Sequence, residues 1–559
     1  MGGAREAMTD VLTFPHFEPH FPRDRWSLPN VLEHQAEVRA DRPCLSWTDA
    51  GKAYSFAEVN AIANRLARGF QSKGVKKGDY VVIFLPNCLE YVFSWYALAK
   101  LGAVEVTVGD SYKGAFLRHQ ANLSKSSIIV TTPELAERLI EIEEELVHIE
   151  HCILVSENDA EPLPAFSRIT TSRFSDLYAD DASNLGIPVG PRDAAAVLFT
   201  SGTTGLSKGV LMSHSHFYFF AEEDLQLVRL TENDVYSTSF PLFHGNAQFL
   251  TVYPSLLAGA HCVLYTRFSA SDFIGRIRRS GSTVCNLLGA TMAFILAQPP
   301  RPDDKDHKLT RIYAAPLAPD LGAKFVDRFG DITFVDGFGQ TEISNIFQTP
   351  WQAERPAGAS GVLVDQFFEV RLADPETGEE VAEGEIGELL IRPKIPGIVC
   401  MEYLGMPEKT VEAWKDLWFH TGDALRRDER GWYFFVDRVK DALRRRGENI
   451  SSFEVESVVR SHHAVAECAV VAAKADEEGS EDEVKVFIVL NDGVELDYDD
   501  LAAWCDAKMP SFMVPRFVEV IEALPQTPSQ KVQKKELRER GNGPATWDRT
   551  RQPAFARKA

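Results

Sequence analysis

The first part of the chain alternates segments of helical apolar spacing with short, continuous apolar runs. Residues 55–74 (SFAEVNAIANRLARGFQSKG) place apolar side chains three and four positions apart, which is the spacing of an amphipathic helix. Ser55 and Glu58 stand at the positions of a capping box, and Gly74 stands where a helix stops. The run Tyr80–Pro86 (YVVIFLP) follows. The pattern predicts a capped helix and then a buried strand.

The same alternation continues to about residue 350. An apolar helix that ends near Gly102 precedes a second short strand (AVEVTV, 103–108), and Thr132-Pro133 is a typical helix start. The stretch DITFVDGFG (331–339) predicts a strand that runs into a glycine turn. Strands that alternate with helices at this pitch indicate βαβ units and a largely parallel sheet covered on both faces.

Two later regions have a different pattern. From Gly361 to about Tyr433, short strands are separated by turn residues, which predicts a β-rich subdomain. Beyond residue 441 the pattern predicts a compact α+β unit. Its expected elements are a helix capped by Ser451 with Glu454, strands at 468–474, 484–490 and 517–524, a helix at about 501–508, and a solvated acidic turn, DEEGSEDE, at 476–483. We therefore expect an α/β fold, with a large N-terminal domain of mixed sheets (1–436) and a small α+β C-terminal domain (442–559).

Composition narrows the class of protein. The chain has 559 residues, 45% of them apolar, and chains of this length usually form two or more domains. The formal net charge of −22 opposes non-specific binding to nucleic acid or anionic lipid, so a polyanionic ligand has to be captured locally. The eight cysteines show no paired spacing, the N-terminus lacks an apolar signal region, and no apolar run has membrane-spanning length. These features favour a soluble, cytoplasmic protein with reduced thiols and no stable membrane insertion.

A run of hydroxyl and glycine residues at 200–209 (TSGTTGLSKG) ends in a lysine. It follows a strand-like segment, AAAVLF, and precedes another buried segment, GVLMSHSHFYFF. A loop of this kind can direct backbone N–H groups and hydroxyls at one anion, and Lys208 can complete the site. It is not a Walker motif, because Lys208 is followed by Gly209 rather than by Ser or Thr. From composition alone, a phosphate site and a flexible loop both remain open.

The stretch LFTSGTTGLSKGV (198–210) resembles the signature of the adenylate-forming superfamily, which includes acyl-CoA synthetases, adenylation domains of nonribosomal peptide synthetases and firefly luciferases. That motif normally has Pro where this chain has Ser207. Five further segments resemble the family's motifs in the family's order: FPLFHGNAQ (240–248), DGFGQTE (336–342), TGD (421–423), DRVKD (437–441) and LPQTPSQK (524–531). The segments PLFHGNAQ and RRRGENISSFEVE look most like the carnitine/crotonobetaine-CoA ligase branch.

The resemblance implies an ATP-dependent acid–CoA ligase. Such an enzyme converts a carboxylate and ATP into acyl-AMP and pyrophosphate, and then converts acyl-AMP and coenzyme A into acyl-CoA and AMP. Because two anions must be brought together, the reaction requires cations and aimed donors. The phosphate residues implied are Thr200, Ser201, Gly202, Thr203, Thr204, Gly205 and Lys208, with Thr341 close by. Thr200 and Glu342 are implied to hold Mg²⁺, although the isolated segment QTE is also typical of a helix-start cap.

Two further motifs are implied to bind the nucleoside. Phe338 replaces the family's usual Tyr as the ring that stacks on adenine. The segment YAAPLAPDL (313–321) resembles the strand-to-turn segment on the other side of adenine, with two alanines in place of glycines. The implied adenine residues are Ala315, Pro316, Asp336, Gly337, Phe338 and Gly339. Asp423 is implied to bind the ribose hydroxyls, as an acid at a strand end, and Arg438 to support it; an ordinary turn aspartate is the alternative.

The C-terminal domain is implied to be mobile. Residues 437–441 resemble the interdomain hinge, with Lys440 as its pivot, and Lys531 resembles the lysine that is carried into the adenylation site. Gln530 stands where the family usually has Gly before that lysine. Gly447 resembles the glycine that lets the pantetheine of coenzyme A pass. The cluster Arg444–Arg446 beside it supports coenzyme A as acceptor or is an ordinary solvated basic turn.

His244 resembles the histidine that gates the acyl pocket, although a core histidine is the alternative. The pocket wall is expected to include Asn246, residues 286–291 and Gly339. We expect a small carboxylic acid as substrate, no nucleic-acid partner and a possible homodimer. The identity of the acid does not follow from the motifs. Two alternatives stay open: transfer of the acyl group to a carrier protein or an amine, and a nucleotide-binding relative without turnover.

Overall fold

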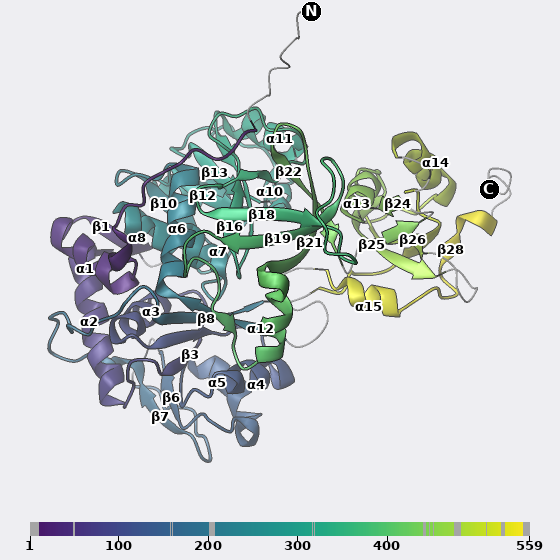
Figure 1. The fold of residues 1–559 in the computed structure, drawn as a ribbon. Helices are drawn as coiled ribbons and strands as arrows, with labels where there is room; N and C mark the ends of the chain where they lie inside the picture. The colour runs from purple at the N-terminus through teal and green to yellow at the C-terminus, as the bar shows by residue number, and fades with distance from the viewer. Residues whose placement is uncertain are drawn as a thin grey trace, which may run out of the picture.

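The computed structural model describes residues 11–48, 51–156, 158, 160–200, 207–315, 317, 319–439, 443–445, 448–450, 452–474, 482–509, 511, 513–526 and 532–551. Figure 1 shows a large body, purple to green, and a smaller body beside it that contains the olive and yellow C-terminal elements. Two apolar clusters of the small body consist only of residues from Leu443 onward. Each body therefore has apolar packing of its own. Among the described residues, no helix is long and apolar enough to cross a bilayer.

An eight-stranded sheet forms one half of the large body, in the order β20-β9-β8-β4-β3-β5-β6-β7. The strands β3 to β8 pair in parallel, whereas β9 is antiparallel to both of its neighbours. Val81 and Ile83 pack with helices α2 and α3, and Val82 and Phe84 pack with α4 and α5 on the other face. The bounds are β3 Tyr80–Phe84, β4 Val104–Thr107, β5 Ile128–Thr131, β6 His151–Leu154, β7 Thr170–Arg173, β8 Ala194–Thr200, β9 Lys208–Ser213, β20 Glu402–Tyr403, α2 Phe56–Ser72, α3 Leu89–Leu101, α4 Gly114–Leu123 and α5 Pro133–Ile140.

The local start and stop signals of this half are confirmed. The Ser55 hydroxyl accepts the Glu58 N–H at 3.2 Å, and the Glu58 carboxylate accepts the Ser55 N–H at 2.7 Å, so the capping box is formed. The hydroxyl of Thr132 accepts the N–H of Leu135 at 3.3 Å at the start of α5. Gly102 ends α3 at a φ of 67°, a conformation that glycine adopts without strain. Short-range chemistry therefore fixes these boundaries.

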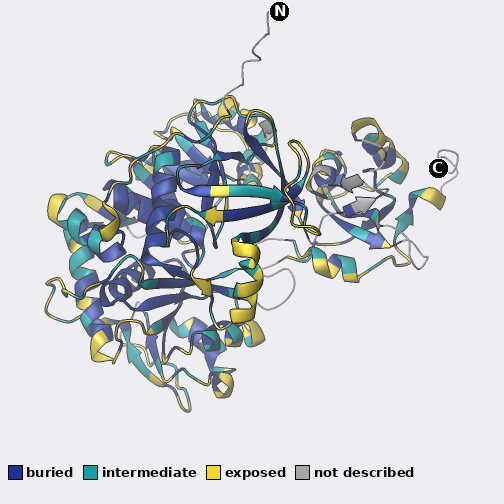
Figure 2. Ribbon diagram, in the orientation of Figure 1, coloured by how far each residue is buried: buried dark blue, intermediate teal, exposed yellow. Residues whose placement is uncertain are grey.

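A seven-stranded sheet forms the second half, in the order β14-β13-β12-β10-β11-β1-β2, and is parallel except for its edge strand β2. Helix α6 contacts β8, β9, β13 and β16 and so lies between sheets; Figure 2 shows it in dark blue at the centre of the large body. The bounds are β1 Pro43–Trp47, β2 Lys52–Ser55, β10 Val235–Thr238, β11 His261–Leu264, β12 Val284–Leu287, β13 Arg311–Ala314, β14 Thr333–Val335, α1 Leu28–Val38, α6 His214–Val228, α7 Gly245–Ala247, a π-helix Gln248–Val252, α8 Tyr253–Ala258, α9 Phe273–Ser280, α10 Gly289–Leu296 and α11 Pro319–Phe329.

An antiparallel sheet of seven strands confirms the β-rich subdomain but corrects its start. Its order is β15-β16-β17-β22-β21-β19-β18. Gly337–Gln340, expected as a glycine turn, is its first strand, because pairing with β16 overrides the low strand propensity of glycine. A Cβ at Gly339 would lie 2.0 Å from the Ser344 carbonyl oxygen, so only glycine fits there. The other bounds are β16 Ser344–Gln348, β17 Gly361–Leu363, β18 Phe368–Ala373, β19 Gly387–Pro393, α12 Pro407–Ala413, β21 Phe419–Arg427 and β22 Trp432–Arg438.

The small body contains the expected helices and strands and further short elements. Its sheet has the order β25-β26-β27-β28, and a separate hairpin, β23 with β24, precedes it. The hairpin strands β23 and β24 and the short elements α15 and β28 were not predicted. The bounds are β23 Leu443–Arg445, β24 Glu448–Ile450, α13 Ser452–Arg460, β25 Val465–Lys474, β26 Asp482–Leu490, α14 Tyr498–Lys508, β27 Phe517–Val520, α15 Lys534–Glu539 and β28 Trp547–Asp548. Most of the predicted acidic turn lies outside the described residues.

A buried carboxylate joins the two bodies. Asp437, at the end of β22 and 5% exposed, accepts the Arg438 N–H at 2.7 Å and the Ser452 N–H at 2.9 Å. Because Ser452 is the first residue of α13, this bond satisfies one of the N–H groups that a helix start leaves unpaired. Ser451 and the Glu454 side chain, which we expected to cap this helix, lie outside the described part. The large body thus supplies a cap to a helix of the small one.

We expect Asp437→Ala to destabilise the start of α13 by about 1 kcal/mol, because an N-cap acceptor is lost. Hydrogen exchange followed by mass spectrometry should then be faster for the amides of 452–460. Asp437→Asn keeps an acceptor and should exchange more slowly than the Ala variant. A matched control is Asp497→Ala, which removes the cap of α14 and should leave α13 unchanged. Equal exchange of α13 in all of these proteins would contradict the capping role.

Candidate functional site

Residues from three of the motifs meet where β9, β15, β20 and β21 come together. Lys208 begins β9, Gln340 ends β15, Glu342 lies in the turn after β15, and Asp423 lies on β21. Strand β20 belongs to the same chain segment as the antiparallel sheet, yet it pairs with β9 of the eight-stranded sheet. This crossing joins the two sheets at the site.

Lys208 and Glu342 contact the same tyrosine. The Lys208 ammonium nitrogen lies 3.8 Å from the centroid of the Tyr403 ring, and the Tyr403 hydroxyl donates to Glu342 Oε1 at 2.9 Å. Burial and the neighbouring Glu342 carboxylate raise the pKa of Tyr403 well above its usual value, so the hydroxyl keeps its proton. A residue predicted for phosphates and one predicted for the metal are thus linked through one side chain.

The phosphate loop itself is described only at its ends. Thr200 closes β8 and pairs with Lys208 across the strands, and its hydroxyl lies 3.5 Å from the Lys208 carbonyl oxygen. The side chain of Ser207, which replaces the family's Pro, accepts a hydrogen bond from Gln120 Nε2 at 3.0 Å. The change from Pro therefore gives this loop a side-chain anchor to α4. Residues Ser201, Gly202, Thr203, Thr204 and Gly205 lie outside the described part of the chain.

Asp423 is bound by two other side chains at the predicted ribose position. Its carboxylate accepts hydrogen bonds from Gln340 Nε2 and pairs with Arg438 Nε at 2.8 Å. Asp423 is 2% exposed and lies within β21, directly opposite Arg438 on β22. The expectation of a strand-end or turn aspartate is therefore wrong, because TGD continues an antiparallel strand. Pairing with an arginine and an amide fixes the orientation of this carboxylate.

Glu342 lies in a turn between two strands and not at the start of a helix, which was one of the two expectations for its segment. The segment QTE does not start a helix: Thr341, Glu342 and Ile343 form the turn between β15 and β16. Glu342 is 7% exposed, and the N–H of Cys400 donates to its backbone oxygen at 2.8 Å. Its carboxylate and the Thr200 hydroxyl are hard oxygen donors, which suit Mg²⁺ held by few protein ligands together with substrate phosphates. The residues present therefore fit the predicted metal.

One predicted adenine residue, Asp336, forms an ion pair that is largely buried. Asp336 is 4% exposed and pairs with Arg355 Nη2 at 2.5 Å, while Arg355 Nε donates to the Ala359 oxygen at 2.8 Å. Burial raises the pKa of Asp336 to about 7, although the Arg355 guanidinium opposes the rise. The ring of Phe338 packs against Phe347 and Phe435, at centroid distances of 5.9 Å in each case.

Near His244, a polar chain runs from the segment FPLFHGNAQ into the core. His244 Nδ1 accepts the Asn246 N–H at 3.2 Å, so the partly exposed histidine caps a short helix and is not a fully buried core residue. Asn286 Nδ2 donates to Asn246 Oδ1 at 3.1 Å, and the Tyr236 hydroxyl donates to Asn286 Oδ1. Asp224 Oδ2, on buried helix α6, lies 3.4 Å from that hydroxyl. The side chains of Asn246 and Asn286 are therefore held together behind His244.

Some predicted site residues lie outside the described residues, namely Pro316, Lys440, Gly447 and Lys531, as do Arg446 and the side chains of Arg444 and Arg445. Ala315 is described at the end of β13 and is partly buried.

Comparison with known proteins decides the family. A model of the AMP-binding enzyme family matches residues 32–403, and a model of the AMP-binding enzyme C-terminal domain matches residues 454–531. The chain belongs to the AMP-binding enzyme family. It is 32% identical over 524 residues to the crotonobetaine/carnitine–CoA ligase of Salmonella paratyphi A. The aligned region covers 92% of this chain and 99% of the relative. The resemblance drawn from the motifs is thereby confirmed.

Solved structures of similar proteins confirm the α/β fold of this AMP-binding enzyme. The anthranilate CoA ligase AuaEII in complex with anthranoyl-AMP matches with a TM-score of 0.82 and 26% identity, over 93% of this chain and 98% of that one. ATP-bound MatB from Rhodopseudomonas palustris matches with a TM-score of 0.79 and 24% identity, over 92% and 98%. The likeness extends over both bodies of the AMP-binding enzyme.

Sequence analysis missed three residues that contact the predicted ones: Gln340, Arg355 and Tyr403. Gln340 stands inside the motif DGFGQTE, so of the three residues it was the easiest to predict as part of the site. Tyr403 has one local signal, since it precedes a turn and the helix start Pro407-Glu408. In the structure, the Thr410 hydroxyl of that helix accepts the Tyr403 N–H at 3.0 Å. Nothing in the local sequence of Arg355 indicates its distant partner.

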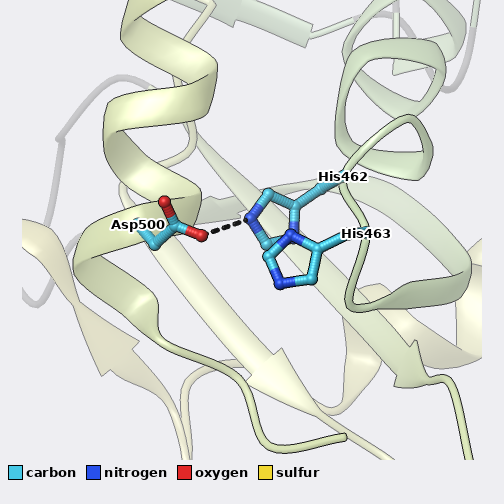
Figure 3. Close-up of side chains that lie close together, drawn as sticks. All are labelled: His462, His463 and Asp500. Atoms are coloured by element: carbon cyan, nitrogen blue, oxygen red, sulfur yellow. Dashed lines mark hydrogen bonds and ion pairs between the residues drawn. The ribbon is translucent and has the colours of Figure 1, made fainter.

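A histidine pair in the small body of the AMP-binding enzyme has a simpler role than metal binding. Figure 3 shows His462, His463 and Asp500 side by side, with His462 Nε2 bonded to Asp500 Oδ2 at 3.1 Å. His462 Nδ1 accepts the Ala464 N–H at 3.3 Å, which leaves the ring proton on Nε2. That nitrogen therefore donates to Asp500 instead of offering a lone pair to a metal. The contact links the segment that follows α13 to α14.

Asp336 should make the stability of the AMP-binding enzyme depend on pH. The folded-state pKa of about 7 lies above the ordinary 3.8, so the folded protein keeps a proton that the unfolded chain loses between these values. The contribution of this group is therefore complete below about pH 4 and decreases as the pH rises to about 7, by at most about 4 kcal/mol. In Asp336→Asn this dependence is absent.

The check is the melting temperature of both proteins from pH 4.5 to 8. The difference, wild type minus variant, should fall as the pH rises and level off above pH 7. A constant difference across the range would contradict the raised pKa. Asp272→Asn, which alters a partly exposed carboxyl with a lowered pKa, is a control for general effects of removing a charge.

Proposed function

We propose that this AMP-binding enzyme is an ATP-dependent carboxylic acid–CoA ligase that works through an acyl adenylate. The observation that supports it most is the meeting of motif residues from distant parts of the sequence: Lys208 and Glu342 on one tyrosine, and Asp423 between Gln340 and Arg438. Cations, carboxylates and an oriented ribose acceptor in one place are the parts that adenylation requires.

In the first half-reaction, a carboxylate oxygen attacks the α-phosphorus of ATP, and the bond to the bridging oxygen of pyrophosphate breaks. Thr200 and Lys208, with the loop between them, hold the phosphates that leave. Asp423 and Arg438 hold the ribose, while Phe338 and Asp336 line the adenine site. Thr200 and Glu342 would hold Mg²⁺, which supplies positive charge to the phosphates when bound.

In the second half-reaction, the thiol of coenzyme A attacks the acyl carbonyl carbon, and AMP leaves with its oxygen. We propose that residues 437–441 act as the hinge between these steps. The small domain would present Lys531 for adenylation and the segment around Gly447 for thiol transfer. The Asp437 bond to Ser452 lies where this hinge begins.

The acid is proposed to be small and to carry a polar group. Relatives of this chain are ligases of different acids, crotonobetaine or carnitine in one case and anthranilate in another, so the family alone does not choose one. Asn246 and Asn286, expected in the pocket wall, are hydrogen-bonded to each other and to buried polar groups. Amide side chains in the pocket wall favour an acid whose tail can form hydrogen bonds, and they disfavour an acid whose tail is purely aliphatic.

The proposal predicts pyrophosphate release from ATP with an acid from a panel, and acyl-CoA and AMP when coenzyme A is added. The panel should pair acids of equal length with and without a polar or cationic tail. Lys531→Ala should lower the adenylation rate about 100-fold or more, because a positioned cation is lost from the transition state. Lys535→Ala, an exposed change on α15, should leave the rate unchanged.

Three outcomes would contradict parts of the proposal. No pyrophosphate release with any acid, from an enzyme that binds ATP, would favour a relative without turnover. Release of free adenylate without acyl-CoA formation would favour a carrier protein or an amine as acceptor. Full activity of Lys531→Ala would exclude its catalytic role.

Lys440→Pro tests the hinge. Proline fixes φ near −65° and should restrict the exchange of the two domains. We expect one half-reaction to be impaired at least tenfold more than the other. The adenylation step is followed as pyrophosphate exchange, and the thiol step as acyl-CoA formation from supplied acyl adenylate. Equal loss in both steps, in a variant that still binds ATP and melts like the wild type, would argue against the hinge.

A further inference from the structure

We propose that Tyr403 is a positioning residue for the phosphate and metal groups of this site: its hydroxyl orients the Glu342 carboxylate, and its ring holds the Lys208 ammonium. This proposal rests on the proposed function, since it assigns to Tyr403 a part in binding Mg²⁺ and ATP. Tyr403 lies outside the motif segments quoted above, and the comparisons assign it no role.

The hydroxyl contact is buried and has one direction. Tyr403 is 5% exposed and Glu342 is 7% exposed, with 2.9 Å between the Tyr403 hydroxyl and Glu342 Oε1. A carboxylate oxygen only accepts hydrogen bonds, so the tyrosine hydroxyl is the donor of this bond. A donor on Oε1 fixes the rotation of the carboxylate, so that its other oxygen faces one direction. A metal ligand held in this way loses less conformational freedom when the ion binds.

The ring contact concerns the other charge. The ammonium of Lys208 lies 3.8 Å from the ring centroid, within the range of a cation–π attraction. A lysine side chain has four rotatable carbon bonds and costs up to about 2 kcal/mol of rotamer entropy to order. The ring reduces the number of directions that this ammonium samples. It thus directs Lys208 toward the same place as Glu342.

Tyr403 acts from a rigid support. The Met401 and Leu404 N–H groups donate to the Leu211 and Gly209 oxygens of β9, each at 2.8 Å. The Thr410 hydroxyl of α12 accepts the Tyr403 N–H at 3.0 Å. The strand that carries Tyr403 is therefore bonded to the strand that begins at Lys208. The relative positions of the ring and the lysine backbone are fixed by backbone pairing, which a hydroxyl deletion leaves intact.

Two substitutions separate the two contacts. Tyr403→Phe removes the hydroxyl and keeps the ring, whereas Tyr403→Leu removes both. We measure the affinity for ATP by titration calorimetry without any acid substrate, first in EDTA and then at a series of MgCl₂ concentrations. Tyr253→Phe is the matched control, because it removes a buried hydroxyl that has no hydrogen-bond partner among the described residues.

For Tyr403→Phe we expect wild-type affinity for ATP in EDTA and a requirement for about tenfold more MgCl₂ to reach half of the maximal affinity gain, since a hydrogen bond to a charged group is lost. For Tyr403→Leu we expect the same shift and, in addition, an affinity about threefold weaker in EDTA. The control should match the wild type in both conditions. Melting temperatures show whether each variant is folded; the Phe variant carries the test if the Leu variant is not.

The proposal is overturned if Tyr403→Phe has the wild-type MgCl₂ dependence. It is also overturned if the Phe variant loses affinity equally with and without MgCl₂, because that result indicates general damage rather than loss of carboxylate orientation. A wild-type protein that binds no ATP in either condition would instead refute the proposed function, and this inference with it.

Discussion

The backbone pairing of β20 with β9 is the constraint on which the site depends. Only two residues form β20, yet their segment donates to β9 at both ends and also donates to the turn that carries Glu342. The chain reaches this point from the antiparallel sheet and pairs with the outer strand of the other sheet. Backbone bonds of this kind hold position more strictly than side-chain contacts, because each peptide group has few alternatives once it is buried. This pairing therefore aligns the residues for the phosphates with those for the ribose, which lie on separate sheets.

How far the fold could be predicted depended on the range of the interactions. The capping box of α2, the glycine stop of α3 and the Thr132 cap of α5 use residues within four positions of one another, and all were predicted. The strand Gly337–Gln340 was missed because its glycines disfavour a strand locally, and only the partner β16 makes one. The extra strand β28 pairs two residues with β27, a contact that no local pattern announces.

The site shows the same division. The order of six motifs indicated the family, and the residues of those motifs that the structure describes include Lys208, Glu342 and Asp423 at one place. Their surroundings were not predictable, since Tyr403 reaches Glu342 from 61 positions away and Gln340 reaches Asp423 from 83 positions away. A sequence read without relatives carries no information on such pairs, because neither residue is unusual in its own segment. The acid has the same limit, since its pocket is assembled from several separate segments.

The bond between Asp437 and Ser452 also has a consequence for the proposed movement of the small body. Any rotation of that body about the chain that follows Asp437 must separate the carboxylate from the start of α13. The helix then loses a cap worth about 1 kcal/mol, which corresponds to a population ratio of about five. In the proposed rotation, this bond would therefore favour the observed arrangement, but only by this small factor.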